Sequence, residues 1–234
     1  MAEQLHLSLA THQAANFDHF CWQGNASLKT ALTHFASSSE QQLLIKGSRH
    51  AGGRLLLQAL CQQWPNQRVA YLPLDKLIAQ PVSVLDGIEH YEVFALDSLH
   101  VIQQSAAWQE RVFSLFNQVM LRPTTRWVGH IVEEPEQPAA TGLADLDSRL
   151  GLGVQLSINE PLSPQEAKAS LDWYQQTFGI SLSEAFKEKL LLQLPRRCSA
   201  YRRFFLSISE HGPMHNQREM LDLLNQISQE ASKG

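Results

Sequence analysis

Short apolar segments alternate with amphipathic segments over the first 160 residues, a pattern typical of strands and helices packed around a mostly parallel sheet. The apolar segments predict strands at 43–45, 69–72, 91–96, 126–132 and 153–158. The amphipathic segments predict helices at 54–64 and 108–120, with apolar residues at helical spacing. The stretch 133–142, with its two prolines, is expected to be a loop or a short irregular helix. We therefore expect an α/β domain with helices around a parallel sheet.

The pattern changes at 159–164, after which every segment reads as helical. Ser163 stands where a helix cap is expected, with Pro164 at the first helical position and Glu166 three residues after the cap. The helical segments that follow are 165–178, 183–193, 201–209 and 217–229. We therefore expect a flexible tail over 1–15, an α/β base domain over 16–160 and a small helical domain over 161–234.

The composition limits the classes of function. The chain has 234 residues, 44% of them hydrophobic, and a net charge of −4, so it has no broad basic field for a nucleic-acid backbone. Its three cysteines are scattered, without the spacing of metal ligands, which favours buried thiols in a reducing compartment. No leader-like start and no apolar run long enough for a membrane span is apparent, so we expect a cytoplasmic protein without a metal site built from these cysteines.

A glycine-rich loop follows the first strand and precedes a helix, the context in which backbone N–H groups bind phosphate. Gly47 and Gly52 keep the spacing of a phosphate loop, but Gly53 and Arg54 follow where lysine and a hydroxyl residue handle the terminal phosphates and magnesium. Arg54 could reach a phosphate, although it cannot coordinate magnesium. The alternative is a glycine turn that serves only the strand-to-helix geometry.

Asp97 ends the third strand and is followed by Ser98, not by a second carboxylate. Nucleotide hydrolysis needs one group to hold the metal and another to orient the attacking water. Asp97 could still contact a bound metal, but the second role is missing. We therefore expect intrinsic hydrolysis to be slow or absent.

Several segments, in order along nearly the whole chain, carry a resemblance to a known family. They are Phe17–Phe20, Gly24–Asn25, Tyr71–Asp75, Leu85–Glu89, Leu96–Asp97, Trp108, Phe113–Asn117, Leu143–Leu150 and Pro161–Ser163. They resemble the Hda family, DnaA-related AAA+ regulators of bacterial replication initiation that lack the terminal DNA-binding domain of DnaA. The resemblance implies an AAA+ fold: a P-loop-type parallel sheet flanked by helices, followed by a small α-helical lid.

Arg149 lies in the segment that best matches the family, Asp145–Leu150. The resemblance implies that it is an arginine finger, which acts in trans on ATP bound to DnaA and needs no competent local site. An arginine finger stabilises charge on the transferring phosphoryl group. The alternative is that Arg149 pairs with Asp145 or Asp147 and merely closes a helix.

Residues 4–9 resemble the sliding-clamp-binding peptide of the same family, with Gln4, Leu5, Leu7 and Leu9 as the contact residues. In an extended segment, alternating leucines fill apolar pockets while glutamine offers hydrogen bonds at the rim. The family usually has proline where Ser8 stands. Because serine does not restrict the backbone as proline does, ordering of the peptide on binding should cost more conformational entropy here. The implied partners are the DNA polymerase III sliding clamp and DnaA.

The resemblance also implies two sensor residues and a nucleotide, which we expect to be weakly bound ADP, with magnesium left open. His130 stands where relatives place a polar sensor on the fourth strand, or it is simply a satisfied core histidine. For the sensor arginine of the lid we favour Arg202 over Ser199 and Arg203. The alternative is that the lid arginines (Arg196, Arg197, Arg202 and Arg203) form a solvated face.

Three functions remain at this point. The chain could be an activator of ATP hydrolysis by DnaA, or a non-catalytic adaptor at the clamp or origin. The third, an autonomous ATPase, is disfavoured by the missing residues of the phosphate loop, and a protein of any of these kinds could self-associate.

Overall fold

The computed structural model describes residues 15–134, 136, 139–160, 163–211 and 217–231. The expected clamp-binding residues Gln4, Leu5, Leu7 and Leu9 lie outside this part of the chain. None of the described helices is both long enough and apolar enough to cross a membrane.

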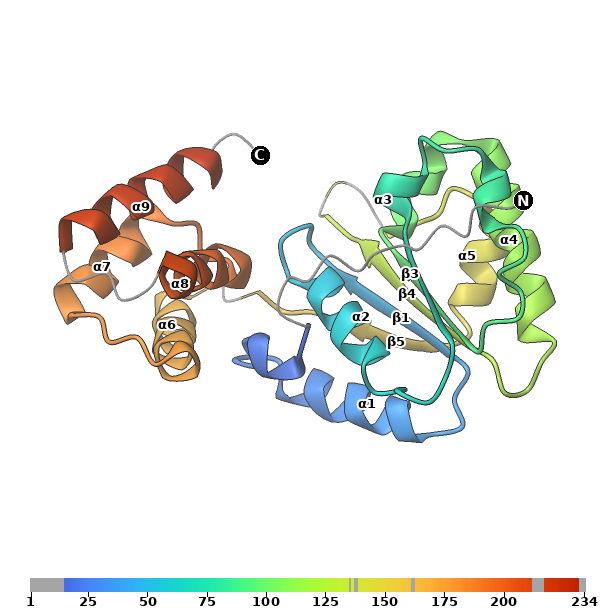
Figure 1. Cartoon of the computed structure of the whole chain (residues 1–234), viewed down its shortest axis with the longest axis horizontal. Coiled ribbons are helices and arrows are strands. Elements are labelled where there is room, and N and C mark those ends of the chain that lie inside the picture. The colour runs from blue at the N-terminus through green and yellow to red at the C-terminus, as the bar shows by residue number, and fades with distance from the viewer. Residues whose placement is uncertain (1–14, 135, 137–138, 161–162, 212–216, 232–234) are drawn as a thin grey trace.

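One five-stranded, all-parallel sheet forms the centre of the base (Figure 1), in the order β2-β3-β4-β1-β5. The strands are β1 (Gln42–Gly47), β2 (Val69–Pro73), β3 (Val93–Asp97), β4 (Arg126–Val132) and β5 (Val154–Ser157). Because all strands are parallel, their carboxyl ends share one edge of the sheet, where the loop after β1 meets Asp97 at the end of β3. The expected α/β fold class is thus confirmed, with β3 beginning two residues later than the apolar segment suggested.

Helices cover both faces of the sheet and then form a separate group after β5 (Figure 1). The helices are α1 (Ala26–Ser37), α2 (Gly53–Cys61), α3 (Leu74–Leu77), α4 (Ala106–Met120), α5 (Ala144–Leu150), α6 (Pro164–Phe178), α7 (Glu184–Gln193), α8 (Cys198–His211) and α9 (Gln217–Ala231). Short 3-10 turns occur at Phe17–His19, Val82–Leu85 and Leu99–Gln104. Of these elements, α1, α3, α5 and the 3-10 turns had no counterpart among the expected segments.

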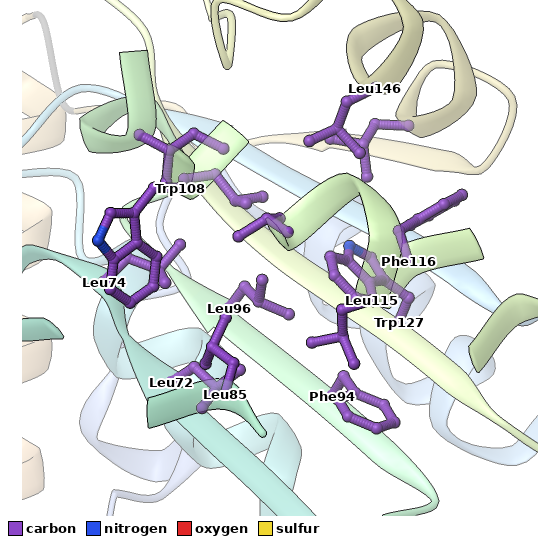
Figure 2. Close-up of a cluster of buried hydrophobic side chains, with 14 of the residues drawn as sticks. Leu72, Leu74, Leu85, Phe94, Leu96, Trp108, Leu115, Phe116, Trp127 and Leu146 are labelled. Carbon is purple, nitrogen blue, oxygen red and sulfur yellow. The ribbon is translucent and has the colours of Figure 1, made fainter. Parts of the chain in front are cut away.

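Side chains that alternate along the strands separate the base core into two layers. On one face Leu44, Leu96 and Trp127 pack with α4, α5 and the turns near them (Figure 2). On the other face Leu43 and Ile45 pack against α1 and α2. The helix α5 therefore lies on the opposite face of the sheet from α2, the helix that follows the phosphate loop.

The helices after β5 have their own apolar core, with Cys21 from the N-terminal segment as a member. Helix α6 begins as expected: the Ser163 hydroxyl accepts a hydrogen bond from the Glu166 N–H at 3.2 Å, and the Glu166 carboxylate accepts one from the Ser163 N–H at 3.0 Å. This reciprocal capping box fixes the direction in which the chain enters the lid.

Candidate phosphate-loop site

The loop after β1 has the backbone of a phosphate loop. Gly52 adopts a left-handed conformation (φ 94°) and directly precedes α2, where a side chain would also meet the ring of Phe20 at 3.0 Å. A glycine is required here because other residues rarely adopt this φ. The first-turn N–H groups of α2 have no acceptor within the helix, so they and the helix dipole favour an anion at this point.

Gly53, at the position of the usual lysine, is enclosed by His130 from β4. A Cβ atom at Gly53 would overlap Cδ2 and Nε2 of the His130 ring and stand 3.0 Å from its Cε1. His130 is 4% exposed, and its Nε2 has no hydrogen-bond partner in the described part of the chain. The histidine therefore occupies the space through which a lysine side chain would leave the loop.

Asp97 is fully buried and surrounded by the chain's own polar groups. Its carboxylate lies 2.8 Å from His130 Nδ1 and 2.5 Å from Arg54 Nε, and it accepts a hydrogen bond from the Tyr71 hydroxyl at 2.9 Å. Ser98, whose backbone is left-handed at φ 63°, also donates from its hydroxyl to Asp97 at 3.3 Å. The sequence placed Arg54 and Asp97 in the same site, and the structure brings them into a direct ion pair.

The charges of this cluster hold each other in the ionised state. Burial by itself would raise the pKa of Asp97, but the hydrogen bond and charge of His130, the charge of Arg54 and the Tyr71 hydroxyl together lower it. Burial likewise opposes the charge of Arg54, yet Asp75, which accepts a hydrogen bond from Arg54 at 2.7 Å, and Asp97 raise its pKa. Burial and the nearby carboxylate of Asp97 raise the pKa of Tyr71.

A magnesium ion, which nucleotide chemistry on such folds implies, does not fit these residues. The Asp97 oxygens already face the cation Arg54 and three neutral or titratable partners, and no hydroxyl stands at position 54 to complete a metal shell. In the described residues no cluster of three or more histidine, cysteine or acidic side chains could hold a metal ion. Arg54 occupies, as an internal cation, the place beside Asp97 that a metal would need.

The sensor arginine expected at Arg202 lies apart from this cluster. Its charge acts on His19, and its own pKa is lowered because the side chain is half-buried. The lid arginine whose charge is felt at the phosphate loop is Arg197, which together with burial lowers the pKa of His50. Arg202 lies within α8, whereas Arg197 directly precedes the helix.

Arg149 is exposed on α5, remote from its own chain's loop because α5 and α2 cover opposite faces of the sheet. Leu146 and Leu150 anchor the short helix in the core, and the Arg149 guanidinium lies 5.3 Å from the centre of the Phe113 ring. Within the described residues it forms no ion pair with Asp145 or Asp147; the Asp147 carboxylate instead accepts from the Thr141 N–H at 2.8 Å. The pairing that would have explained Arg149 as a helix-closing residue is not seen there.

Two glutamates of the site were not expected from the sequence. Glu134, just after β4, accepts a hydrogen bond from the Arg49 N–H of the loop at 2.9 Å, and Glu160, just after β5, accepts one from the Ser48 hydroxyl at 2.8 Å. Their only signal in the sequence is that each follows a strand whose carboxyl end lies beside β1. A cavity of about 380 Å³ opens next to them, lined by Gln23, Gly24, Ser48, Ile158, Asn159, Glu160 and Glu166.

Four features together define an AAA+ fold. They are the sheet order, the loop between β1 and α2, the acidic residue at the end of β3 and the helical group after β5. No family model matches the sequence. Among solved structures, domain III of the Thermotoga maritima replication initiation protein DnaA is similar, with a TM-score of 0.73 and 18% identity over 92% of this chain and 98% of that one.

AMPPCP-bound DnaA from Aquifex aeolicus is also similar (TM-score 0.60, 17% identity), with 81% of this chain covering 61% of that one. The RuvB Holliday junction branch migration motor of Thermotoga maritima matches at a TM-score of 0.55 and 13% identity, over 86% of this chain and 69% of that chain. The chain thus has a DnaA-like AAA+ fold.

Proposed function

We propose that this chain regulates bacterial replication initiation by stimulating the hydrolysis of ATP bound to DnaA, with Arg149 as an arginine finger in trans. The observation that supports this most is the contrast between two sites: Asp97 is paired with Arg54, whereas Arg149 is exposed and unpaired by any described carboxylate. A chain whose own acidic residue is neutralised by an arginine has little capacity for hydrolysis, but it can still present a cation to a partner's nucleotide.

The surroundings of Arg149 suit such a role. Leu146 and Leu150 fix α5 on the core, so the position of the Arg149 backbone does not depend on a loop. Contact with the face of Phe113 restrains the guanidinium without neutralising it, because an aromatic ring attracts a cation yet carries no net charge. Arg149 is therefore exposed to solvent and restrained by an uncharged neighbour, which suits contact with a partner's phosphate.

The other parts of the proposal rest on the resemblance to the Hda family. Residues Gln4, Leu5, Leu7 and Leu9 would dock on the sliding clamp and so restrict the activity to clamp loaded on DNA. At the chain's own phosphate loop, Gly47, Gly52, Gly53, Arg54 and Asp97 would hold at most a weakly bound ADP. Arg202, which the resemblance also implies as a nucleotide contact, interacts with His19 and not with this cluster, so it would contribute only if the lid moved toward the loop. No direct binding to nucleic acid is proposed.

The decisive experiment is turnover of ATP bound to DnaA, in the presence of clamp loaded on DNA, with wild type and three variants. We expect Arg149→Ala to abolish stimulation and Arg149→Lys to retain little, because a lysine lacks the planar fork that contacts a phosphoryl group. Arg68→Ala serves as the matched control, since Arg68 is also a surface arginine, with a side chain 62% exposed. Full stimulation by Arg149→Ala, or equal loss in Arg68→Ala, contradicts the proposal.

A second candidate is a non-catalytic adaptor that tethers replication proteins to the clamp or the origin. The Arg54–Asp97 ion pair favours it, because a chain without nucleotide chemistry has no need of a free acidic residue in its own site. Wild-type protein that binds the clamp and DnaA but leaves the turnover of DnaA-bound ATP unchanged would establish the adaptor.

A further inference from the structure

The loop donors that face an anion in phosphate-binding proteins are engaged here by carboxylates of the same chain. The backbone continues the sheet at this point, where the Glu133 N–H donates to the Gly47 carbonyl at 2.9 Å. The next residue, Glu134, turns its carboxylate to the Arg49 N–H at 2.9 Å. Glu134 is thereby held beside the loop by its own carboxylate and by the backbone bond of the residue before it.

Glu160 approaches the same loop from the other neighbour of β1. Its Oε2 accepts from the Ser48 hydroxyl at 2.8 Å, while its Oε1 is buried and has no hydrogen-bond partner among the described residues. Burial lowers the pKa of His50 in the middle of the loop, and the charges of Glu134 and Glu160 act in the opposite direction. Two negative charges therefore flank the segment Ser48–His50.

The space that these carboxylates border is built to receive negative charge. The loop that both carboxylates contact leads directly into α2, a nine-residue helix whose first-turn N–H groups have no acceptor within the helix. His130 offers a second, independent sign, because its Nε2 is buried beside Gly53 and has no partner in the described part of the chain. The loop therefore favours an anion, and the carboxylate of Glu134 already occupies one of its N–H donors.

We propose that Glu134 is a built-in anion of the phosphate loop, which a nucleoside diphosphate must displace in order to bind. The competing ligand is the diphosphate group without magnesium, since Asp97 is held by Arg54 and does not fit a metal ion. Glu134 thereby sets the nucleotide affinity of this chain from outside the loop. This assignment rests on the ADP binding proposed above, but not on the role proposed for Arg149, which is tested separately.

The charges around the loop give the direction of the effect. Glu134 and Glu160 are balanced there by Arg49 and Arg197, all four of which act on His50. Replacing Glu134 by glutamine removes one negative charge and keeps the size of the side chain, and the Arg49 N–H is left with a neutral amide oxygen as acceptor, which is a weaker bond than that to a carboxylate. Removal of one like charge from a ligand site near the protein surface raises affinity by roughly tenfold.

The test is calorimetric titration of ADP into the full chain in EDTA, with wild type, Glu134→Gln and Glu133→Gln. Glu133 is the matched control because it is the adjacent residue, carries the same charge and is exposed. We expect Glu134→Gln to bind ADP about tenfold more tightly than wild type, and Glu133→Gln to be unchanged. Glu134→Gln that binds no better than wild type, or that shows no binding at millimolar ADP, overturns the proposal, as does an equal gain in Glu133→Gln.

Two further measurements test whether the gain in affinity arises at the phosphate loop and not elsewhere in the protein. Inorganic pyrophosphate should show the same gain in Glu134→Gln, whereas adenosine should show none, because the effect lies at the phosphates. Hydrogen exchange at the Arg49 amide should become faster in ligand-free Glu134→Gln than in wild type, at an unchanged unfolding temperature. Unchanged exchange at this amide, or a gain for adenosine as large as for pyrophosphate, refutes the built-in anion.

Discussion

The replacement Gly53→Ala tests whether His130 excludes a side chain from the lysine position of the loop. Gly53 has no positive φ, so alanine meets no backbone strain there. The added Cβ would overlap the His130 ring and lie 3.0 Å from its Cε1, inside the ~3.5–4.0 Å at which carbon atoms contact favourably. The ring must therefore move, and its 2.8 Å contact with Asp97 moves with it.

The magnitude follows from three contributions. Overpacking of a buried site costs about 1–3 kcal/mol, and disturbance of a hydrogen bond to a charged group costs about 1.5–3 kcal/mol. Alanine in place of glycine in a helix contributes about 1 kcal/mol in the opposite direction. We expect Gly53→Ala to lower the free energy of unfolding by about 1.5–5 kcal/mol, measured by urea denaturation with tryptophan fluorescence, to which the fully buried Trp127 of the base core contributes.

Two variants make this prediction specific. Gly151→Ala is the matched control, because Gly151 has φ −66° and an added Cβ meets only backbone oxygens at 3.3 Å and 3.4 Å; it should change stability by less than about 1 kcal/mol. In the His130→Ala background, Gly53→Ala should cost almost nothing, since the obstructing ring is gone. Wild-type stability of Gly53→Ala, or the same loss in both backgrounds, refutes the reasoning.

Three further changes test the ion cluster and the entry to the lid. Because the pKa of Asp97 lies below its ordinary value of 3.8, its ionised form adds stability above that pH, and this stability is lost as the pH falls through the lowered value; Asp97→Asn should flatten the acid limb of a stability profile below about pH 4. Arg54→Ala leaves Asp97 without its cation and should lower the free energy of unfolding by about 1–3 kcal/mol, whereas Arg54→Lys, with one compact charge, should recover part of the loss; equal losses would mean that charge plays no part. Ser163→Ala removes the Glu166 N–H acceptor and should cost about 1 kcal/mol in thermal or urea unfolding, and no change would show that the cap adds nothing.

The fold class could be predicted because strand segments and helical segments follow different periods, and the apolar runs of β1 and β4 are typical of parallel strands buried on both faces. The helix cap at Ser163 is purely local, so its residues alone were sufficient. Helix α1 has no side-chain cap at Asn25, but its buried residues Leu28, Leu32 and Phe35 stand at helical spacing, so the periodic signal was present in the sequence and was missed. Its position is decided by the sheet face that it covers.

The candidate site was predictable only where its residues lie at strand ends. Arg54 and Asp97 were expected together because parallel strands end at one edge, but no sequence spacing shows that they pair directly. The contact between His130 and Gly53 joins positions 77 residues apart, and it depends on how far β4 lies from the start of α2. Glu134 and Glu160 were missed for the same reason, since each reaches the loop from a strand that is distant in sequence.

The side chains at positions 53, 54 and 130 constrain one another. No single substitution among them would therefore give the loop of an ATP-hydrolysing protein. A lysine at position 53 meets the His130 ring, and a hydroxyl residue at position 54 would leave the buried Asp97 carboxylate without its cation. Removal of His130 to make room for the lysine would in turn take away the partner of Asp97 at 2.8 Å. Each step toward the ATP-hydrolysing arrangement destabilises the core before the next step can compensate, because a buried charge left unpaired costs several kcal/mol. The loop is therefore held in its present form by packing and charge at the sheet edge, and these constraints do not reach Arg149 on the opposite face.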